Sequence, residues 1–173
     1  PLPRPQTRAA PRLNETYFYD EVLDGKRIRV AALYLPIGAA EAPEVMLVPD
    51  FFSAKGYWSK ADKPARIITS IAMFYDLDHP IEFAREVGSV LADDGIWHFE
   101  QSYMPSMLRT NSYDTICHEH LEYYSLAVVK NILERAGMRL VDVVMNAVNG
   151  GSFAVTAAKA ANRSVKTNHA VID

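Results

Sequence analysis

Residues 65–100, ARIITSIAMFYDLDHPIEFAREVGSVLADDGIWHFE, contain the sequence alternation from which the fold class can be inferred. The apolar run RIITSIAMF predicts a buried strand, and an acidic turn closed by Pro80 follows it. Apolar residues then recur at helical spacing; Pro80 suits the first helical turn, and Asp94-Gly95 marks the predicted end. IWHFEQSYM predicts the next strand. A strand, a helix and a strand in this order predict a βαβ unit, whose two strands are parallel.

The same alternation continues toward the C-terminus, where SLAVVKNILERAGMRLVDVVMN predicts a helix ending at Gly137 and then a strand. NGG (149–151) turns the chain into a last strand, SFAVTAAKA, close enough to its predecessor for antiparallel pairing. N-terminal to residue 65, the segment VMLVPDFFS predicts a further buried strand. We therefore expect an open α/β fold with a mostly parallel sheet, helices on its faces and an antiparallel strand pair near the C-terminus.

The N-terminal region follows a different pattern. TYFYDEV and KRIRVAALYL flank Asp24-Gly25, which predicts a β-hairpin, although the second run also suits a parallel core strand. Residues 1–14 contain four prolines and three arginines, and they predict a disordered or irregular arm. The expected organisation is this arm, one domain over residues 15–160 and a short tail over 161–173.

Composition limits the class of protein. The chain has 173 residues, is 49% hydrophobic and 23% charged, and carries a formal net charge of −3, which is typical of a globular domain without a nucleic-acid surface. No apolar run approaches a membrane span, and no signal-peptide pattern opens the sequence. Cys117 is the single cysteine, so no internal disulfide or cysteine-based zinc site is expected. A cytoplasmic setting is the default expectation.

Several polar residues fall where predicted strands end. Asp50 ends one strand, Ser70 lies late in the next, and Glu100 and Gln101 end a third, with Tyr103 close behind. In open α/β sheets, ligands bind beyond the carboxyl ends of the strands. An active site at this rim is therefore expected.

The segment YDTICHEHLEYYS (113–125) follows the third of these strands and allows several chemical readings. His118 and His120 could bind a metal with Glu122 or a more distant ligand, although no known ligand spacing is present. Cys117 could act as a nucleophile with a neighbouring histidine as its base. A histidine could instead perform general acid–base catalysis beside a carboxylate, with tyrosines binding a polar substrate. The remaining interpretation is a loop whose histidines only bond to the backbone.

Five segments together carry a family resemblance: LVPDFFSA, IITSIAMFYDLDHP, GIWHFEQSYMPSML, YDTICHEHLEYYSL and VNGGSFAVTAAK. Over roughly residues 45–160 the chain resembles the class I S-adenosylmethionine-dependent C-methyltransferases related to the NDP-deoxysugar C-methyltransferases. The resemblance implies a Rossmann-like domain that binds S-adenosylmethionine and needs no metal. It also implies a small-molecule substrate, a nucleotide-linked keto-deoxysugar or a similar carbonyl compound, and it is compatible with a homo-oligomer.

The resemblance also implies roles for particular residues. Asp50 and Phe51 match the segment that touches the adenine, and Ser70, Ile71 and Ala72 match the strand end beside the methionine portion of the cofactor. For catalysis, His120 would be the general base, Glu119 would lie beside it, and Tyr123 or His118 would donate to the enolate oxygen. The residues expected to bind the substrate are Glu100, Gln101, Tyr103, Cys117 and Asn149.

The sequence also departs from the family pattern. Cys117 stands where many relatives carry a tyrosine, which affects the predicted oxyanion contact. The four cysteines of the family's N-terminal zinc module are absent, and residues 1–45 lack the glycine-rich loop that cradles the cofactor. We therefore expect a domain that is incomplete at its N-terminal side. The alternative function is a catalytically inactive methyltransferase-like fragment that acts as a binding or structural module.

Overall fold

The computed structural model describes residues 16–23, 26–33, 48 and 50–172. The chain divides into two compact units, residues 1–51 and 52–173. In the first unit, strands β1 (Thr16–Leu23) and β2 (Lys26–Leu33) pair antiparallel, which confirms the predicted hairpin. The predicted arm at 1–14, the Asp24-Gly25 turn, and residues 45–47 and 49 of VMLVPDFFS lie outside the described residues.

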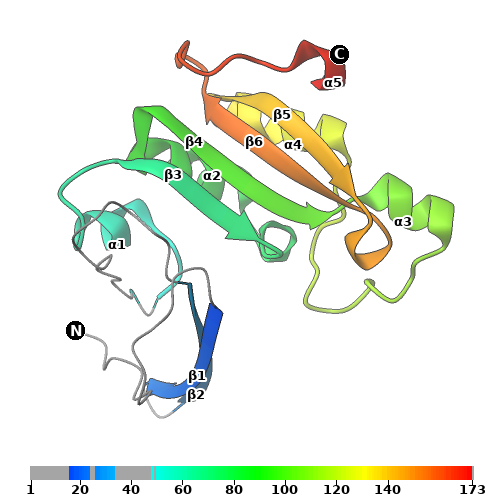
Figure 1. Ribbon diagram of the computed structural model, residues 1–173, viewed down its shortest axis with the longest axis horizontal. Helices are drawn as coiled ribbons and strands as arrows, with labels where there is room; N and C mark the ends of the chain where they lie inside the picture. The colour runs from blue at the N-terminus through cyan, green and yellow to red at the C-terminus, as the bar shows by residue number, and fades with distance from the viewer. Residues whose placement is uncertain (1–15, 24–25, 34–47, 49, 173) are drawn as a thin grey trace. The chain divides into compact units, whose positions relative to one another are not determined.

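The second unit contains a four-stranded sheet in the order β3-β4-β6-β5 (Figure 1). Its strands are β3 (Ala65–Ile71), β4 (Leu91–Ser102), β5 (Met138–Asn146) and β6 (Ser152–Lys159). β3 and β4 are parallel, as the predicted βαβ unit requires, and β5 and β6 form the predicted antiparallel pair. These observations confirm the α/β fold.

The expected mostly parallel sheet is mixed over the strands that the structure describes. β6 lies between β4 and β5 and is antiparallel to both, so one of the three pairings is parallel. The short connection between β5 and β6 is the cause, because a chain can return directly beside the strand it has just left only in the opposite direction.

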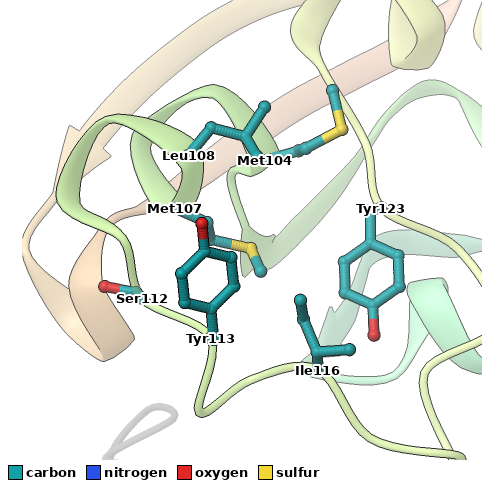
Figure 2. Close-up of a pocket in the computed structure, with 7 residues that line it drawn as sticks. All are labelled: Met104, Met107, Leu108, Ser112, Tyr113, Ile116 and Tyr123. Atoms are coloured by element: carbon teal, nitrogen blue, oxygen red, sulfur yellow. The ribbon is translucent and has the colours of Figure 1, made fainter.

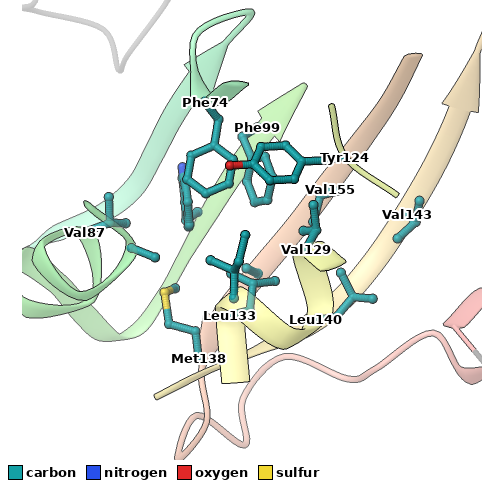
Figure 3. Packing of buried hydrophobic residues seen from close by; sticks show 14 of the residues in the cluster. Phe74, Val87, Phe99, Tyr124, Val129, Leu133, Met138, Leu140, Val143 and Val155 are labelled. Carbon is teal, nitrogen blue, oxygen red and sulfur yellow. The ribbon is translucent and has the colours of Figure 1, made fainter. Parts of the chain in front are cut away.

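Helices α2 (Pro80–Val90) and α4 (Leu126–Arg135) pack against the same face of the sheet (Figures 1 and 3). Successive crossovers of the same hand that advance in one direction across a sheet place their helices on one side. The predicted packing of helices on the sheet is thus confirmed, and these two helices share one face. Side chains alternate between the two faces of the sheet along β4. Trp97 and Phe99 are fully buried on the helix-covered face, whereas His98 is half-buried on the opposite face.

The end of α2 differs from the prediction. The helix stops at Val90, four residues before Asp94, and β4 starts at Leu91. Asp93 and Asp94 extend from the start of this strand and pair with Lys159 and Arg66, each at 2.9 Å. These cross-strand ion pairs replace the turn that Asp94-Gly95 suggested.

Two short helices were not predicted. α1 (Ala54–Trp58) begins after Ser53, whose side chain accepts a hydrogen bond from the Gly56 amide. α3 (Met104–Thr110) follows β4 directly, where the predicted strand IWHFEQSYM extended too far. Pro105 in the first turn of α3 was the local signal for a helix start.

The C-terminal segment packs on β5. The Arg139 guanidinium donates to the carbonyls of Asn162 and Val165 at 2.8 and 2.6 Å and to the Thr167 hydroxyl at 2.7 Å. α5 (His169–Ile172) ends the described residues. Among the helices of the described segments, none has both the length and the apolar character needed to cross a bilayer.

Candidate active site

The segments beyond the carboxyl ends of β3 and β4 are joined by backbone hydrogen bonds. After β3, the Ala72 amide donates to the Glu100 carbonyl at 2.8 Å. The 3₁₀ turn η1 (Phe74–Asp76) follows. Within it, the Tyr75 carbonyl accepts a hydrogen bond from the Glu122 amide at 3.0 Å. These bonds hold loop 111–125, which carries the two histidines, against the rim where the site was expected.

His120 is half-buried and has a defined orientation. Its Nδ1 lies 2.8 Å from the Thr115 carbonyl oxygen, which can only accept, so Nδ1 carries the proton. In the neutral ring this leaves the lone pair on Nε2. The ring packs against Tyr75 with centroids 4.2 Å apart, and the Tyr123 ring lies 6.4 Å away in a T-shaped arrangement. His120 is thus positioned to accept a proton at Nε2.

Tyr75 was not among the predicted site residues. It is buried, and this burial, with smaller effects from Asp76 and Cys117, raises the pKa of its phenol above the usual value. Tyr75 therefore stays protonated at neutral pH beside the His120 ring. Its position in the acidic turn that follows the predicted strand RIITSIAMF was the signal that could have identified it.

The neighbours of His120 in the motif point elsewhere. The side chains of His118 and Glu119 are 91% and 63% exposed, and they pair with each other at 3.2 Å between Nε2 and Oε1. Cys117 is also exposed. The structure therefore brings together His120 and Tyr123 of loop 111–125 and Tyr75 of η1, and not the whole His-Glu-His motif.

A cavity of about 200 Å³ lies between α3 and loop 111–125 (Figure 2). We call it the apolar chamber. Tyr113 and Tyr123 lie on opposite sides of it, with Met107 and Ile116 between them. Met104 and Leu108 complete the apolar lining, and the side chain of Ser112 points away. The chamber was missed in the sequence because helix α3, which supplies both methionines, was missed.

The predicted substrate residues on β4 face different surroundings. The Glu100 carboxylate accepts a hydrogen bond from the Asn146 side chain at 2.9 Å. Gln101 is buried, and its amide atoms have no partner among the described residues. Tyr103 packs its ring on Phe153, with centroids 5.0 Å apart. Gln101 therefore lies in the protein interior, and Tyr103 is half-buried against the core.

Asn149 lies in the turn between β5 and β6. Its φ is +49°, and Gly150 and Gly151 also have positive φ, at +78° and +131°, as expected for a tight NGG turn. The Gly151 carbonyl accepts the Tyr103 amide at 3.0 Å. This turn therefore belongs to the same rim, with the Asn149 side chain exposed.

The residues expected to bind the cofactor fall into both units. Asp50 and Phe51 lie in the first unit; the Asp50 carboxylate accepts from the Phe51 amide at 2.8 Å, and Phe51 is 92% exposed. Ser70, Ile71 and Ala72 lie in the second unit at the end of β3. The Ser70 hydroxyl accepts from Trp97 Nε1 at 2.7 Å, so it already has an internal partner. Within the described ranges, no cluster of three acidic, histidine or cysteine side chains could hold a metal.

The model of the methyltransferase domain family matches residues 10–143, and the chain belongs to this family. Its members are enzymes that use S-adenosylmethionine as the cofactor. The mixed α/β sheet and the rim loops described above agree with this assignment.

Among characterised proteins, the chain is 38% identical to the C-methyltransferase NovU of Streptomyces niveus over 97 residues. The match covers 56% of this chain and 23% of that protein, so the chain spans about a quarter of the relative's length.

Similarity to solved structures is weaker. The mitomycin 7-O-methyltransferase MmcR has a TM-score of 0.46 and 13% identity over 60% of this chain and 32% of that chain. The magnesium protoporphyrin IX methyltransferase ChlM from Synechocystis PCC 6803, solved with bound S-adenosylhomocysteine, has a TM-score of 0.43 and 9% identity over 58% and 48%. The family assignment rests on the sequence match.

Four of the five residues expected at the cofactor have groups available to it. The Phe51 ring is exposed, one Asp50 oxygen is free of the Phe51 amide, and Ile71 and Ala72 are exposed at the strand end. Ala72 has a φ of +52°, an uncommon conformation for a residue with a side chain. Within the second unit, Ile71 and Ala72 are therefore accessible at the strand end, whereas the Ser70 hydroxyl is occupied by Trp97.

Proposed function

We propose that this chain carries the acceptor-activating centre of an S-adenosylmethionine-dependent C-methyltransferase, with His120 as the general base. The observation that carries the proposal is the bond from His120 Nδ1 to the Thr115 carbonyl at 2.8 Å. It leaves Nε2 basic and holds the ring beside Tyr75 and Tyr123. Identity to a C-methyltransferase over the same region supports carbon as the methylated atom.

In the proposed reaction, His120 Nε2 takes a proton from the carbon next to a carbonyl group, and the C–H electron pair forms an enolate. Tyr123, half-buried at the chamber wall, is the better of the two predicted donors to the enolate oxygen, because His118 is directed into solvent. When bound, S-adenosylmethionine supplies the electrophilic methyl group that the enolate carbon takes. Ile71 and Ala72 at the end of β3 are the residues of the second unit proposed to hold it, and the contact of Asp50 and Phe51 with the adenine stays a prediction from the sequence.

The proposed substrate is a small carbonyl compound, of which a nucleotide-linked keto-deoxysugar is the kind suggested by the resemblance of residues 45–160. Glu100 and Asn149 remain proposed contacts to it, since both lie at the rim. A cytoplasmic setting and a biosynthetic role in modified sugars are part of the same proposal.

Cofactor binding is the first test. Titration of the purified chain with S-adenosylmethionine and S-adenosylhomocysteine in a calorimeter should give a Kd below about 100 μM, or about 5.5 kcal/mol. A folded chain that binds neither compound would contradict the proposal and favour an inactive methyltransferase-like module.

The role of His120 is tested by His120→Asn, whose amide can still donate to the Thr115 carbonyl but cannot act as a base. We expect methyl transfer to a keto sugar to fall by about 10²–10⁴-fold, while the affinity for S-adenosylmethionine is unchanged. Transfer of a labelled methyl group gives the rate. His118→Asn is the matched control, because that exposed side chain makes no contact with His120 in the described site, and it should retain the rate within about threefold. Equal losses in both variants would exclude His120 as the base.

A further inference from the structure

The bond from His120 Nδ1 to the Thr115 carbonyl does not by itself fix the orientation of the imidazole ring. The last side-chain torsion of a histidine is broad and roughly two-fold, so a ring held by a single hydrogen bond can turn over. Turning over would take Nδ1 away from the carbonyl and let the proton move to Nε2, the atom proposed to act as the base. A carboxylate could provide a second contact, but the Glu119 side chain is 63% exposed and pairs with His118. The ring therefore needs another contact that keeps it in place.

Tyr75 makes this contact. The rings of Tyr75 and His120 have their centroids 4.2 Å apart and their planes inclined at 49°. At this separation the two rings touch, so the imidazole cannot turn over unless Tyr75 moves. Tyr123 is a looser neighbour, because its ring centroid lies 6.4 Å from that of His120 and its side chain is half-buried. Of the two aromatic neighbours, Tyr75 is the one that confines the base.

Tyr75 is itself held from two sides. Its side chain is buried, and the preceding residue, Phe74, packs its ring on Phe99 of β4 with centroids 5.3 Å apart (Figure 3). The Tyr75 carbonyl accepts a hydrogen bond from the amide of Glu122, two residues beyond His120. The surface against which the imidazole packs is therefore fixed both to the sheet and to the loop that carries the base.

The ring of Tyr75, rather than its hydroxyl, accounts for this role. Among the residues that the structure describes, the hydroxyl has no hydrogen-bond partner. Burial raises the pKa of the phenol, so at neutral pH it carries no charge that could pair with a protonated histidine. A phenylalanine at position 75 would provide the same contact with the imidazole.

We propose that Tyr75 is a positioning residue for His120: its ring prevents the imidazole from turning over, so that Nδ1 stays on the Thr115 carbonyl and Nε2 stays free to accept a proton. This inference rests on the proposed C-methyltransferase function and adds to it a residue outside the His-Glu-His motif. Tyr75 acts through His120 and takes no proton itself.

The test is NMR of the full chain without cofactor, labelled with ¹⁵N in its histidines. The chemical shifts of the two ring nitrogens report which of them carries the proton, and at about pH 8 histidines of ordinary pKa are neutral. The signals of His120 are those missing from His120→Asn. His118, whose side chain is 91% exposed, serves as the internal reference for a ring that exchanges its proton freely. We expect His120 to show the Nδ1-protonated form alone.

Variants separate the ring of Tyr75 from its hydroxyl. Tyr75→Leu and Tyr75→Met each remove the ring, and the flexible methionine fills the space if leucine prevents folding, which circular dichroism checks. Both should shift the His120 nitrogen signals toward the averaged positions seen for His118. Tyr75→Phe should leave them unchanged.

Phe83→Leu is the matched control. This half-buried residue of α2 packs its ring on Phe74 with centroids 6.0 Å apart, and it makes no ring contact with His120 in the described structure. Its loss therefore loosens the same aromatic cluster without removing the surface beside the base. The His120 signals should stay as in the unmodified chain.

Methyl transfer gives the second readout. Loss of the ring should lower kcat for transfer of a labelled methyl group to a keto sugar by about 10–100-fold, because the base is misplaced. The KM for S-adenosylmethionine should stay within about threefold, and Tyr75→Phe should retain kcat within the same factor.

Three results would overturn the proposal: unchanged His120 signals in folded Tyr75→Leu or Tyr75→Met, the same change in Phe83→Leu, or a loss in Tyr75→Phe as large as that in Tyr75→Leu. The last would mean that the hydroxyl is the group that acts. Because NMR uses the free chain, it tests the positioning of His120 whether or not methyl transfer occurs. Signals that change as expected in a chain without any methyl transfer would support the positioning and contradict the C-methyltransferase function alone.

Discussion

Ser70 shows how a single side chain acquires a structural partner that its sequence position does not reveal. Its hydroxyl accepts a hydrogen bond from Nε1 of Trp97, which is fully buried on the adjacent strand. An indole N–H in the core needs such an acceptor, because its desolvation is otherwise uncompensated. In the structure Ser70 therefore supports the core, whatever else it does at the strand end.

Ser70→Ala should lower the free energy of unfolding by about 1–2 kcal/mol, because it leaves the buried indole N–H unpaired. Thr69→Ala is the matched control, because Thr69 is the preceding residue of β3 and is exposed. This variant should lower the free energy of unfolding by less than about 0.5 kcal/mol. Urea unfolding of both variants gives the comparison. A Ser70→Ala variant as stable as the control would show that the bond does not contribute.

At the scale of elements, the NGG turn fixes the position of helix α3. A Cβ added at Gly151 would lie 2.5 Å from the Cβ of Ser106, which is buried in α3. The turn and the helix approach each other more closely than any side chain permits, and the φ of +131° also requires glycine. The position of α3, and with it one wall of the apolar chamber, depends on this contact.

We expect Gly151→Ala to cost about 3 kcal/mol or more, since it combines backbone strain with a steric clash. Gly137→Ala tests strain alone: its φ is +74° and no atom lies within 4 Å of the added Cβ, so about 1–2 kcal/mol should be lost. Ser106→Gly in the Gly151→Ala background should recover the steric part. Similar losses for the two glycine variants would contradict the close approach as the cause.

Across the whole second unit, one aromatic cluster links β4, η1 and loop 111–125. Phe74 of η1 packs on Phe99 and Tyr124 (Figure 3). Its ring centroid lies 5.3 Å from that of Phe99, 5.5 Å from that of Tyr124 and 5.4 Å from that of Trp97. Tyr124 is 3% exposed, and its hydroxyl has no partner among the described residues. Burial, with a smaller effect from Glu122, raises its pKa.

These shifts predict a loss of stability at alkaline pH. A tyrosine whose pKa is raised by folding contributes stability that is complete below its unfolded pKa of about 10 and is lost as pH rises through the folded value. Tyr75 shifts in the same direction. Tyr124→Phe should reduce the loss of unfolding free energy between pH 7 and about pH 11, and at pH 7 it should be neutral or stabilising by about 1 kcal/mol.

Urea unfolding across this pH range measures the effect. Tyr113→Phe is the control, because its ring is 63% exposed, and it should leave the pH dependence of stability unchanged. A steeper alkaline loss in Tyr124→Phe would contradict the assignment of the shift to burial of this phenol.

Elements that depend on neighbouring residues in the sequence were predicted, whereas elements that depend on contacts with distant residues were missed or misplaced. Helix α4, its end at Gly137, strand β5 and the turn before β6 were predicted from periodicity and turn chemistry, and Gly137 has the expected positive φ of +74°. Helix α3 was missed because its seven residues are too few for a periodic signal. The end of α2 was misplaced because Asp93 and Asp94 find partners on other strands.

The α/β alternation, the family and the segment that holds the histidines could be inferred from the amino-acid sequence, because these features depend on spacing along the chain. The orientation of the side chains needed the folded structure: it shows that His120 is half-buried while His118 is exposed, that Tyr75 lies against His120, and that Tyr123 also lines an apolar chamber. The reason is physical: adjacent residues in an irregular loop have no fixed facing. Their orientation follows from hydrogen bonds and packing with distant segments, such as the bond from the Glu122 amide to the Tyr75 carbonyl.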